Sequence, residues 1–338
     1  MNKVFIIAEA GINHNGKIEL AYKLIDVAKD ARADAIKFQT FKSELITSSE
    51  AERADYQKKN MPNKNETQLK MLKRLELNFA SFVKIKRYCD KKGILFLSAT
   101  ADLPSTDFIE PLVPVFKVGS SDLTNYPFLK NLASRRKPII LSTGMSNLNE
   151  VEKAVDIIIE NQFKYETSFP PLSLLHCTTN YPCPYNEVNL KAIFTLKEAF
   201  KLPVGYSDHT LGIEVPVAAV AMGAKIIEKH FTLDKNMEGP DHKASLESEE
   251  LKIMVKAIRN IEEAIGDGIK KPNKSEIEIM QVARKSIVAS KDIKKGDVFT
   301  ENNVIVKRPG IGISPMKWNE IIGRKASKNF IKDELIEL

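Results

Sequence analysis

The chain has 338 residues, of which 43% are hydrophobic and 28% are charged, as in an ordinary globular protein. Its formal net charge is +7, from 51 basic and 44 acidic residues that are interleaved, so nucleic-acid binding is not expected. The positive balance suits a small anionic substrate. A chain of this length predicts either one large barrel with an appended domain or two ordinary domains.

Cysteine usage and the first residues bear on the compartment. The three cysteines, Cys89, Cys177 and Cys183, form no CxxC pair, which indicates a reducing compartment rather than a disulfide framework. The first apolar run, VFIIA at residues 4–8, is followed at once by Glu9, so we expect no signal peptide and no transmembrane helix. We therefore expect a cytoplasmic protein without a membrane partner.

Short β-rich runs alternate with amphipathic helical patterns along the first four fifths of the chain. In chain order the runs read VFIIA, ADAIKF, GILFLS, PVFKVG, PIILST, SLLHCT, PVGYSD and AKIIEKHF. Helical spacing of apolar residues separates them, and Asn147 with Glu150 resembles an N-cap pair. Eight strand–helix units predict an α/β fold, a closed (β/α)8 or TIM barrel, over residues 1–268.

Two segments depart from this alternation. Residues 43–78, between the second and third strands, are longer than a loop and helix need, and we expect them to cover the barrel mouth or a neighbouring protomer. The polar, Gly- and Pro-bearing stretch after Gly266 predicts a linker at residues 269–282. Short strands with tight turns then predict a small, mainly β domain at residues 283–338, which needs docking on the barrel or on a partner.

Polar residues close several of the predicted strands, where the active site of a parallel barrel lies. Two lysines with serine hydroxyls beside them offer the compact positive charge and the donors that a phosphate and a carboxylate need. The alternative is that these lysines are simply solvated, but their recurrence at equivalent strand ends favours a site for a small phosphorylated acid. The set is Glu9, Lys37, Gln39, Lys117, Ser120 and Ser142.

The last two strands carry histidines. GYSDHT places Ser207 and His209 at the end of one strand, and IEKHF places Glu228 and His230 on one face of the next. Neutral imidazoles suit Mn, Co, Zn or Fe, and the carboxylate could hold a metal-bound water. Either histidine alone could be a hydrogen-bonded structural residue or an acid/base, but the pair predicts a divalent metal site.

Two further loops offer groups for a sugar. Asp241, in GPDHKAS, could accept hydrogen bonds from a sugar hydroxyl or act as an acid/base, although Gly-Pro also forms plain turns. Tyr181 and Asn180, in TTNYP, offer an aromatic face and an amide, and the alternative is a buried loop anchor.

These motifs resemble those of the bacterial sialic acid synthases, which include N-acetylneuraminate, legionaminate and, more distantly, pseudaminate synthases. The similarity covers nearly the whole chain. It is carried by AEAGINHNG, KFQTF, ILSTGM, LLHCTTNYP, GYSDHT, IEKHFTLD, GPDHKAS and VKRPG, in the family's order. The resemblance implies a barrel followed by an antifreeze-like (SAF) domain. It also implies a domain-swapped homodimer, in which the small domain covers the partner's active site.

The resemblance also implies roles for single residues. His209 and His230 would bind Mn²⁺, or Mg²⁺, with Glu228 close to a metal-bound water. Phosphoenolpyruvate would be held by Lys37, Lys117, Ser120, Ser142 and Ser207. The sugar would be held by Gln39, Tyr181, Asp241 and Arg308 of the partner subunit.

The implied reaction joins phosphoenolpyruvate to an N-acylated amino-hexose. C3 of phosphoenolpyruvate attacks the open-chain aldehyde, water adds at C2 and phosphate leaves, with Glu9 or Glu228 as the acid/base. We expect an N-acetylneuraminate-type synthase that uses N-acetylmannosamine or a close analogue. The alternative is an N,N'-diacetyllegionaminate synthase that uses 2,4-diacetamido-2,4,6-trideoxymannose. A pseudaminate synthase or a non-catalytic sugar-binding protein is less favoured.

Four positions depart from the family pattern. Ala99 stands where members often have a threonine, so one ligand hydroxyl is missing unless Thr100 replaces it. Asp122 stands for the familiar glutamate, with Ser121 where a glycine is common. Thr179 occupies a position that is asparagine in some members. Because none of these changes removes a predicted metal ligand or lysine, we expect an active enzyme with altered substrate affinity.

Overall fold

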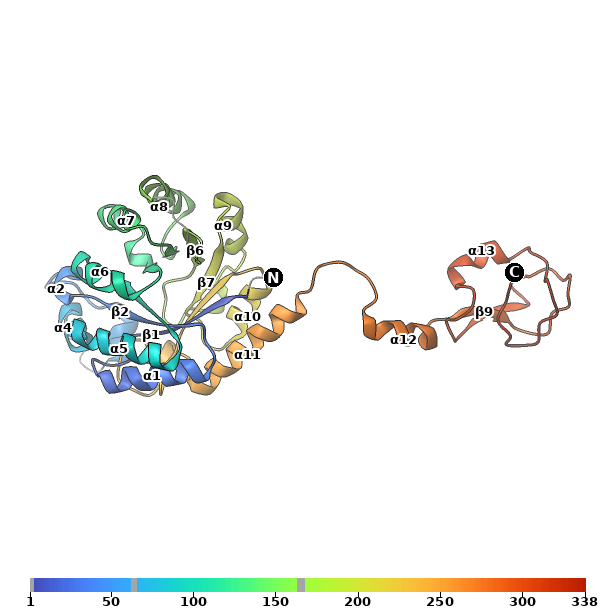
Figure 1. The fold of residues 1–338 in the computed structure, drawn as a ribbon, viewed down its shortest axis with the longest axis horizontal. Helices are drawn as coiled ribbons and strands as arrows, with labels where there is room; N and C mark the ends of the chain where they lie inside the picture. Colours follow the sequence, from blue (N-terminus) through green and yellow to red (C-terminus); the bar gives the residue numbers. More distant parts are fainter. Residues whose placement is uncertain (1–2, 62–65, 163–167) are drawn as a thin grey trace. The chain divides into compact units, whose positions relative to one another are not determined.

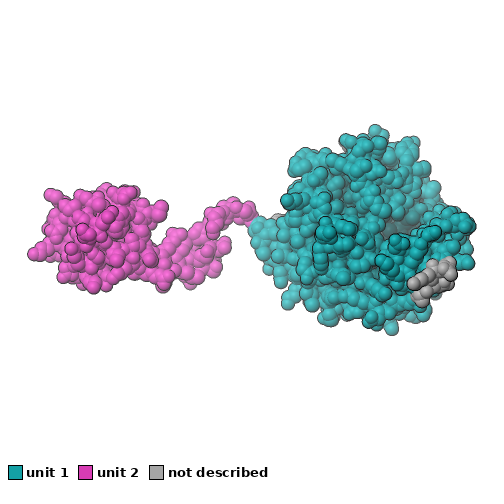
Figure 2. All heavy atoms as spheres, turned by 180° about the vertical axis from the view of Figure 1, so that it is seen from behind, with its two compact units in different colours: residues 1–266 teal, residues 267–338 magenta. Residues whose placement is uncertain are grey.

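The computed structural model describes residues 3–61, 66–162 and 168–338. The chain divides between Gly266 and Asp267 into two compact units, which Figure 2 colours separately. Gly266 and Gly268 flank this junction with φ angles of 66° and 76°, a region that glycine adopts without strain. Within the described ranges, no helix has the length and apolar character needed to cross a membrane.

Eight parallel strands of the first unit close into a barrel, with β8 paired to β1 (Figure 1). Each predicted run forms one of these strands, so the predicted TIM barrel is confirmed. The strands are β1 Phe5–Gly11, β2 Ala35–Thr40, β3 Leu95–Thr100, β4 Phe116–Val118, β5 Ile139–Ser142, β6 Leu172–His176, β7 Val204–Asp208 and β8 Ile226–His230.

Amphipathic helices surround the strands (Figure 1). In α1, Leu24 and Ile25 are fully buried on the face that meets the sheet. In α8, Asn147 and Glu150 cap the first turn reciprocally, as predicted: each backbone N–H donates to the other's side chain, at 2.9 and 3.0 Å. The helices are α1 Ile18–Asp30, α5 Phe79–Lys92, α6 Leu103–Ile109, α7 Tyr126–Ala133, α8 Leu148–Asn161, α9 Ala192–Phe200, α10 Glu214–Ala221 and α11 Ser248–Ala264.

The barrel interior is layered. Strand register places Lys37 of β2 beside Glu9 of β1, and Glu228 of β8 beside Ser207 of β7. A separate apolar cluster from the same strands lies towards their amino ends. It consists of Ile7, Ala35, Leu97, Val115, Ile140, Leu175 and Ile226. The charged layer therefore lies directly above an apolar layer, which fixes its height in the barrel.

Residues 43–78, here called the mouth segment, contain the short helices α2 Ser43–Ile46, α3 Asp55–Asn60 and α4 Gln68–Leu75. Residues 62–65 lie outside the described ranges. The segment has its own apolar cluster, in which Met71 and Leu75 pack with Phe41. Glu76 anchors its start, since the backbone N–H and the hydroxyl of Ser43 donate to that carboxylate at 2.9 and 2.7 Å.

The end of β7 is fastened to β8 by a buried ion pair. Asp208 and Lys229 are both fully buried, and the ammonium donates to Asp208 Oδ2 and to the Thr210 carbonyl, both at 2.5 Å. A buried charge pair of this kind holds its geometry because either partner alone would be left uncompensated. The pair thereby fixes the strand ends from which His209 and His230 project.

The second unit contains α12 Lys274–Ala283, the antiparallel strands β9 Ser286–Ala289 and β10 Val304–Lys307, and α13 Trp318–Ile321. Phe299 and Phe330 centre its small core. Helix α12 occupies most of the segment predicted as a linker, because Asn273 and Glu276 form a capping box that the polar composition masked. Within the described residues, no side chain of α12 is buried.

Candidate active site

A cavity of about 600 Å³ opens at the carboxyl ends of the barrel strands. Apart from Asn180, it is lined by the site residues that the sequence predicts for the barrel, which come from six strands and from loops at the same rim. These residues are Glu9, Lys37, Gln39, Lys117, Ser120, Ser142, Tyr181, Ser207, His209, Glu228, His230 and Asp241. The structure thus gathers groups that are up to 232 positions apart in the sequence, from Glu9 to Asp241.

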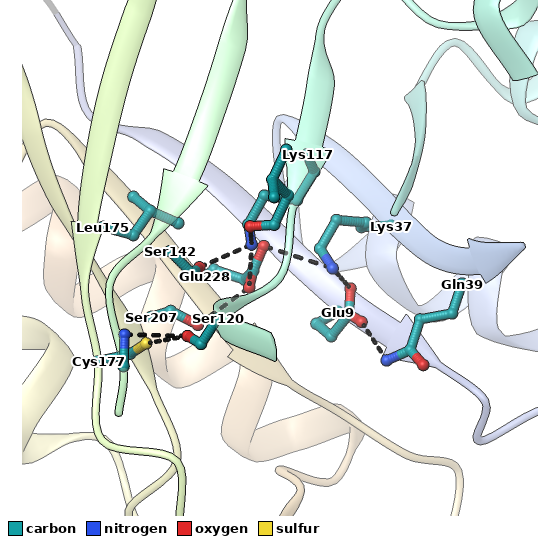
Figure 3. Close-up of polar contacts among 12 residues, drawn as sticks. Glu9, Lys37, Gln39, Lys117, Ser120, Ser142, Leu175, Cys177, Ser207 and Glu228 are labelled. Atoms are coloured by element: carbon teal, nitrogen blue, oxygen red, sulfur yellow. Dashed lines mark hydrogen bonds and ion pairs between the residues drawn. The ribbon is translucent and has the colours of Figure 1, made fainter. Parts of the chain in front are cut away.

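Two lysines and two carboxylates form the floor of this cavity. Lys37 Nζ lies 2.8 Å from Glu9 Oε2 and 3.6 Å from Glu228 Oε2. Lys117 Nζ lies 3.7 Å from Glu228 Oε1, so both ammonium groups approach Glu228 from β2 and β4 (Figure 3). The lysine side chains are only 4% and 3% exposed, which excludes the alternative that they are solvated strand-end residues.

Two serines complete the hydrogen bonding of this floor. Lys117 Nζ donates to Ser142 Oγ at 2.7 Å, and Ser207 Oγ donates to Glu228 Oε1 at 2.9 Å. Both hydroxyls are held by charged partners on neighbouring strands, as Figure 3 shows. A charged partner fixes the rotation of a hydroxyl, so these serines present ordered polar groups to the cavity.

Ser120 lies beside a backbone amide at the same rim. The Gly144 N–H donates to Ser120 Oγ at 3.0 Å, and Cys177 Sγ lies 3.1 Å from the same oxygen. A Cβ atom at position 144 would lie 2.8 Å from Ser120 Oγ and 2.9 Å from Cys177 Sγ, so only glycine allows this approach. The loop after β5 can therefore offer a backbone donor to an anion.

The environment of the floor gives its two carboxylates opposite properties. Burial and the negative charge of Glu228 raise the pKa of Glu9 to about 7, against the attraction of Lys37. Burial opposes ionisation of Glu228 as well, but Lys117, Lys37 and the Ser207 hydroxyl outweigh it and lower the pKa of Glu228 to about 2. At neutral pH Glu228 is an anion, whereas Glu9 can hold or release a proton.

The lysines also differ. Burial lowers the pKa of Lys37, but the charges of Glu228 and Glu9 more than compensate and raise it above its usual value. Burial and the like charge of Lys37 instead lower the pKa of Lys117, which shares Glu228 with Lys37 and has Ser142 as a neutral partner. Lys117 is thus the cation of this floor that a bound anion would stabilise most.

The two predicted metal ligands lie side by side, with ring centroids 5.6 Å apart. Burial lowers the pKa of both imidazoles, so both are neutral at pH 7. His209 Nδ1 lies 2.7 Å from the Thr178 carbonyl, a contact that makes Nδ1 the donor and leaves Nε2 as a lone-pair donor. His230 Nδ1 is buried without a hydrogen-bond partner in the described ranges.

These features fit a divalent cation held by two imidazoles. The described residues contain no cluster of three or more His, Cys, Asp or Glu side chains placed to hold a metal ion. A cation at His209 and His230 would therefore complete its coordination with oxygens from water or a substrate, as catalytic rather than structural sites do.

The residues predicted to bind the sugar lie in different places. Tyr181 and Asp241 line the cavity, and Gln39 Nε2 donates to Glu9 Oε1 at 3.4 Å. Asn180 is exposed and is not among the residues that line the cavity, and its side-chain N–H donates to Glu187 Oε2 at 3.5 Å. Arg308 lies in the second unit, exposed after β10, and its Nε donates to the Ala283 carbonyl at 3.1 Å.

The departures from the family pattern are also located. Ala99 and Thr100 both line the cavity, but the Thr100 hydroxyl is 2.8 Å from that of Thr106 and is engaged there. The Asp122 carboxylate accepts hydrogen bonds from Ser121 and Asn125 at 3.2 and 3.1 Å.

The mouth segment contributes lining residues that the sequence did not single out. The segment was predicted to cover the barrel mouth or a neighbouring protomer, and its residues in the cavity lining confirm the first of these. Nothing in its pattern distinguished the side chains that face the cavity, because the segment is charged throughout. They are Leu45, Ile46, Thr47, Tyr56, Gln57, Gln68 and Leu72.

A closed parallel barrel with paired lysines, paired carboxylates and two neutral imidazoles at its mouth has the arrangement of a barrel enzyme's active site. Residues 24–270 match the NeuB family, and residues 284–337 match the SAF domain. The chain therefore belongs to the NeuB family and carries a C-terminal SAF domain.

Relatives of known name agree with this assignment. The chain is 52% identical to an N,N'-diacetyllegionaminic acid synthase of Campylobacter jejuni, over 99% of both chains. It is 46% identical to an enzyme of the same name from Legionella pneumophila, over 96% of this chain and 91% of that one. A crystal structure of an N-acetylneuraminic acid synthetase from Leptospira borgpetersenii, in complex with citrate, is 38% identical. It covers 82% of this chain and 90% of its own, with a TM-score of 0.71. The chain is thus an enzyme of the nonulosonate synthase type.

We predict that His209→Ala and His230→Ala each abolish the tight binding of Mn²⁺ without unfolding the barrel. The loss should exceed the roughly 10- to 100-fold that removal of an outer partner costs, because each change removes a ligand. Calorimetric titration with Mn²⁺ measures it, and circular dichroism checks the fold. His176→Ala is the matched control, since His176 bonds the Val188 carbonyl outside the cavity. Unchanged Mn²⁺ affinity in either variant would contradict the metal assignment.

Proposed function

We propose that this enzyme condenses phosphoenolpyruvate with the open-chain aldehyde of an N-acylated amino-hexose, which yields a nine-carbon 2-keto-3-deoxy sugar acid and phosphate. The observation that supports this best is the buried floor, where Lys37 and Lys117 lie between two carboxylates with serine donors beside them. The floor adjoins two neutral imidazoles in one cavity. A phosphorylated carboxylic acid and an aldehyde are a pair of substrates that such a site can hold together.

The anionic substrate is assigned to the lysine side of the cavity. Lys117, Ser142 and Ser120 lie on consecutive strand ends, with the Gly144 N–H directed at Ser120 Oγ. A phosphate or carboxylate that replaced these internal bonds would receive charge-assisted bonds from a site already arranged for an anion. Because burial and Lys37 lower the pKa of Lys117, a bound anion would also offset the free-energy cost of its buried charge.

The reaction needs acid/base groups on the same floor. C3 of phosphoenolpyruvate forms a bond to the aldehyde carbon, and the aldehyde oxygen takes up a proton. Water then adds at C2 and gives up one proton. The C2–O bond to phosphate breaks, and the remaining proton of the C2 hydroxyl passes to the departing phosphate, which leaves the 2-keto group. Glu9 can hold the transferable proton near neutral pH, whereas Glu228 stays ionised and stabilises positive charge that develops at C2. A divalent cation at the histidines would supply polarisation of the aldehyde.

We assign the acceptor sugar from the names of the enzymes that this chain resembles. The relatives at 52% and 46% identity both bear the name N,N'-diacetyllegionaminic acid synthase. This favours 2,4-diacetamido-2,4,6-trideoxymannose, the alternative acceptor from the sequence analysis, over N-acetylmannosamine. Apolar lining residues of the mouth segment, such as Ile46 and Leu72, suit the additional acetyl group and the deoxy carbon of that sugar.

An assay of phosphate release tests the function directly. With phosphoenolpyruvate and Mn²⁺, we expect turnover with 2,4-diacetamido-2,4,6-trideoxymannose at least about 10-fold more efficient than with N-acetylmannosamine, since one well-buried acyl group is worth that ratio. The corresponding pseudaminate precursor should react least. Preference for N-acetylmannosamine would reverse the acceptor assignment, and absence of phosphate release with all three sugars would contradict the function.

We also propose that the enzyme works as a domain-swapped homodimer, in which Arg308 of the partner subunit reaches the sugar. Apolar side chains are exposed on the segments that follow the barrel strands, in loops and in the first turns of the helices after them, and exposed apolar patches mark interaction surfaces. They are Leu45, Leu103, Tyr126, Met145, Leu148, Tyr185 and Leu211. The exposed Ile277, Ile279 and Val282 of α12 offer a complementary apolar surface in the second unit.

Complementation between two inactive variants tests this arrangement. If Arg308 acts in the partner's site, mixing His209→Ala with Arg308→Ala protein after dissociation and reassociation restores activity. Random pairing leaves about a quarter of the sites intact, because each heterodimer holds one site with both wild-type residues. Each variant mixed with itself is the control. Failure to exceed the activity of the separate variants, with heterodimers demonstrated, would contradict the sharing of Arg308.

A further inference from the structure

Helix α3 of the mouth segment is fixed to the loop that carries Asp241. Asn60, the last residue of α3, donates its side-chain N–H to the Pro240 carbonyl at 2.7 Å. The Ala54 N–H donates to Gln57 Oε1 at 3.0 Å, which caps the first turn of the helix. Both ends of this short helix are therefore held, and Tyr56 lies between them with its side chain at the cavity.

The ring of Tyr56 belongs to a stack that leads to the predicted metal ligand. Its centroid lies 5.0 Å from that of Tyr181, at an interplanar angle of 31°. The Tyr181 ring lies 4.1 Å from the imidazole of His209. Ring pairs in contact at these separations restrict the orientation of each ring. The stack sets the position of the Tyr56 hydroxyl relative to the place where the aldehyde would bind.

Asp241 has no hydrogen-bond partner for its carboxylate among the described residues, although it is only 6% exposed. Burial raises its pKa to about 6, and no neighbouring cation offsets this. A buried carboxylate without a hydrogen-bond partner destabilises the folded protein. Such a group is retained where a ligand supplies the missing donors.

The Tyr56 hydroxyl lies in the field of this carboxylate. Burial raises the pKa of Tyr56, and the negative charge of Asp241 raises it further, so the hydroxyl keeps its proton. Gln57 Nε2 donates to the hydroxyl oxygen at 3.3 Å. This contact uses a lone pair of the oxygen and leaves the hydroxyl hydrogen free to donate into the cavity.

We propose that Tyr56 is a binding residue for the acceptor sugar. Its hydroxyl donates a hydrogen bond to the sugar. Hydroxyl or amide N–H groups in the same region of the sugar donate to Asp241. This inference rests on the proposed function. An oxygen of the sugar, from a hydroxyl or an amide carbonyl, accepts from Tyr56, while a neighbouring donor of the sugar satisfies Asp241. The mouth segment is thereby part of the acceptor site and not merely a cover over it.

Tyr56→Phe tests this proposal, because it removes the hydroxyl and keeps the stacked ring. We expect the KM for the preferred acceptor to rise roughly 3- to 15-fold, as loss of one neutral hydrogen bond does. The KM for phosphoenolpyruvate and kcat should stay within about twofold, since the hydroxyl touches neither the anion floor nor the reacting carbons. Tyr22→Phe is the matched control, because the Tyr22 ring also packs against a second tyrosine, Tyr88, at 4.6 Å between centroids, and Tyr22 does not line the cavity.

A double-mutant cycle with Asp241→Asn measures whether the two residues hold the same region of the sugar. The combined variant should raise the acceptor KM less than the product of the two single effects. Circular dichroism of each variant confirms the fold. If the two single effects on the acceptor KM simply multiply in the double variant, Tyr56 and Asp241 do not hold the same region of the sugar.

The outcomes separate this inference from the function on which it rests. An unchanged acceptor KM in Tyr56→Phe, or an effect on the KM for phosphoenolpyruvate instead, overturns the inference while wild-type turnover upholds the function. If wild-type protein neither binds nor turns over any of the three sugars in calorimetry and phosphate release, the proposed function fails and the inference falls with it.

Discussion

The structure depends on keeping two lysines charged inside a barrel. An ammonium group buried without a partner would lose its proton or destabilise the fold by several kcal/mol. Lys37 and Lys117 avoid this because Glu9 and Glu228 lie on neighbouring strands at the same height, above an apolar layer that excludes water. Glu228 is shared between both lysines, and Glu9, whose pKa is raised to about 7, does not carry a full negative charge at neutral pH. An arriving anion therefore meets positive charge that is only partly compensated.

This constraint shows why the fold and most of the site were predictable. A lysine within an apolar strand, such as Lys37 or Lys117, indicates that the strand lines a polar site. The parallel barrel then brings the carboxyl ends of all its strands to one rim. Alternation along KFQ and IEKH placed Lys37, Glu228 and His230 on the inner face, and the register agrees. The resemblance to the sialic acid synthases then assigned roles that spacing alone could not.

What the sequence could not predict are contacts set by loop geometry. Asn180 lies next to Tyr181 in the chain, but the loop turns only the tyrosine towards the cavity. Tyr56 lies in a charged segment whose spacing has no period, so its direction follows from the anchoring of Asn60 on Pro240, a contact between residues 180 positions apart. Helix α12 was hidden because its capping box lies within a Pro- and Lys-rich stretch. In each case a tertiary contact or cap overrides the local composition.

The central claim is that the lysine floor binds phosphoenolpyruvate, and calorimetric titration of that compound in the absence of sugar tests it most directly. Lys117→Met keeps the length of the side chain and removes the charge. The account predicts binding to wild-type protein and roughly 10- to 100-fold weaker binding to the variant, the cost of a charge-assisted bond. Equal affinity for both proteins would show that the floor is not the anion site and would contradict the account.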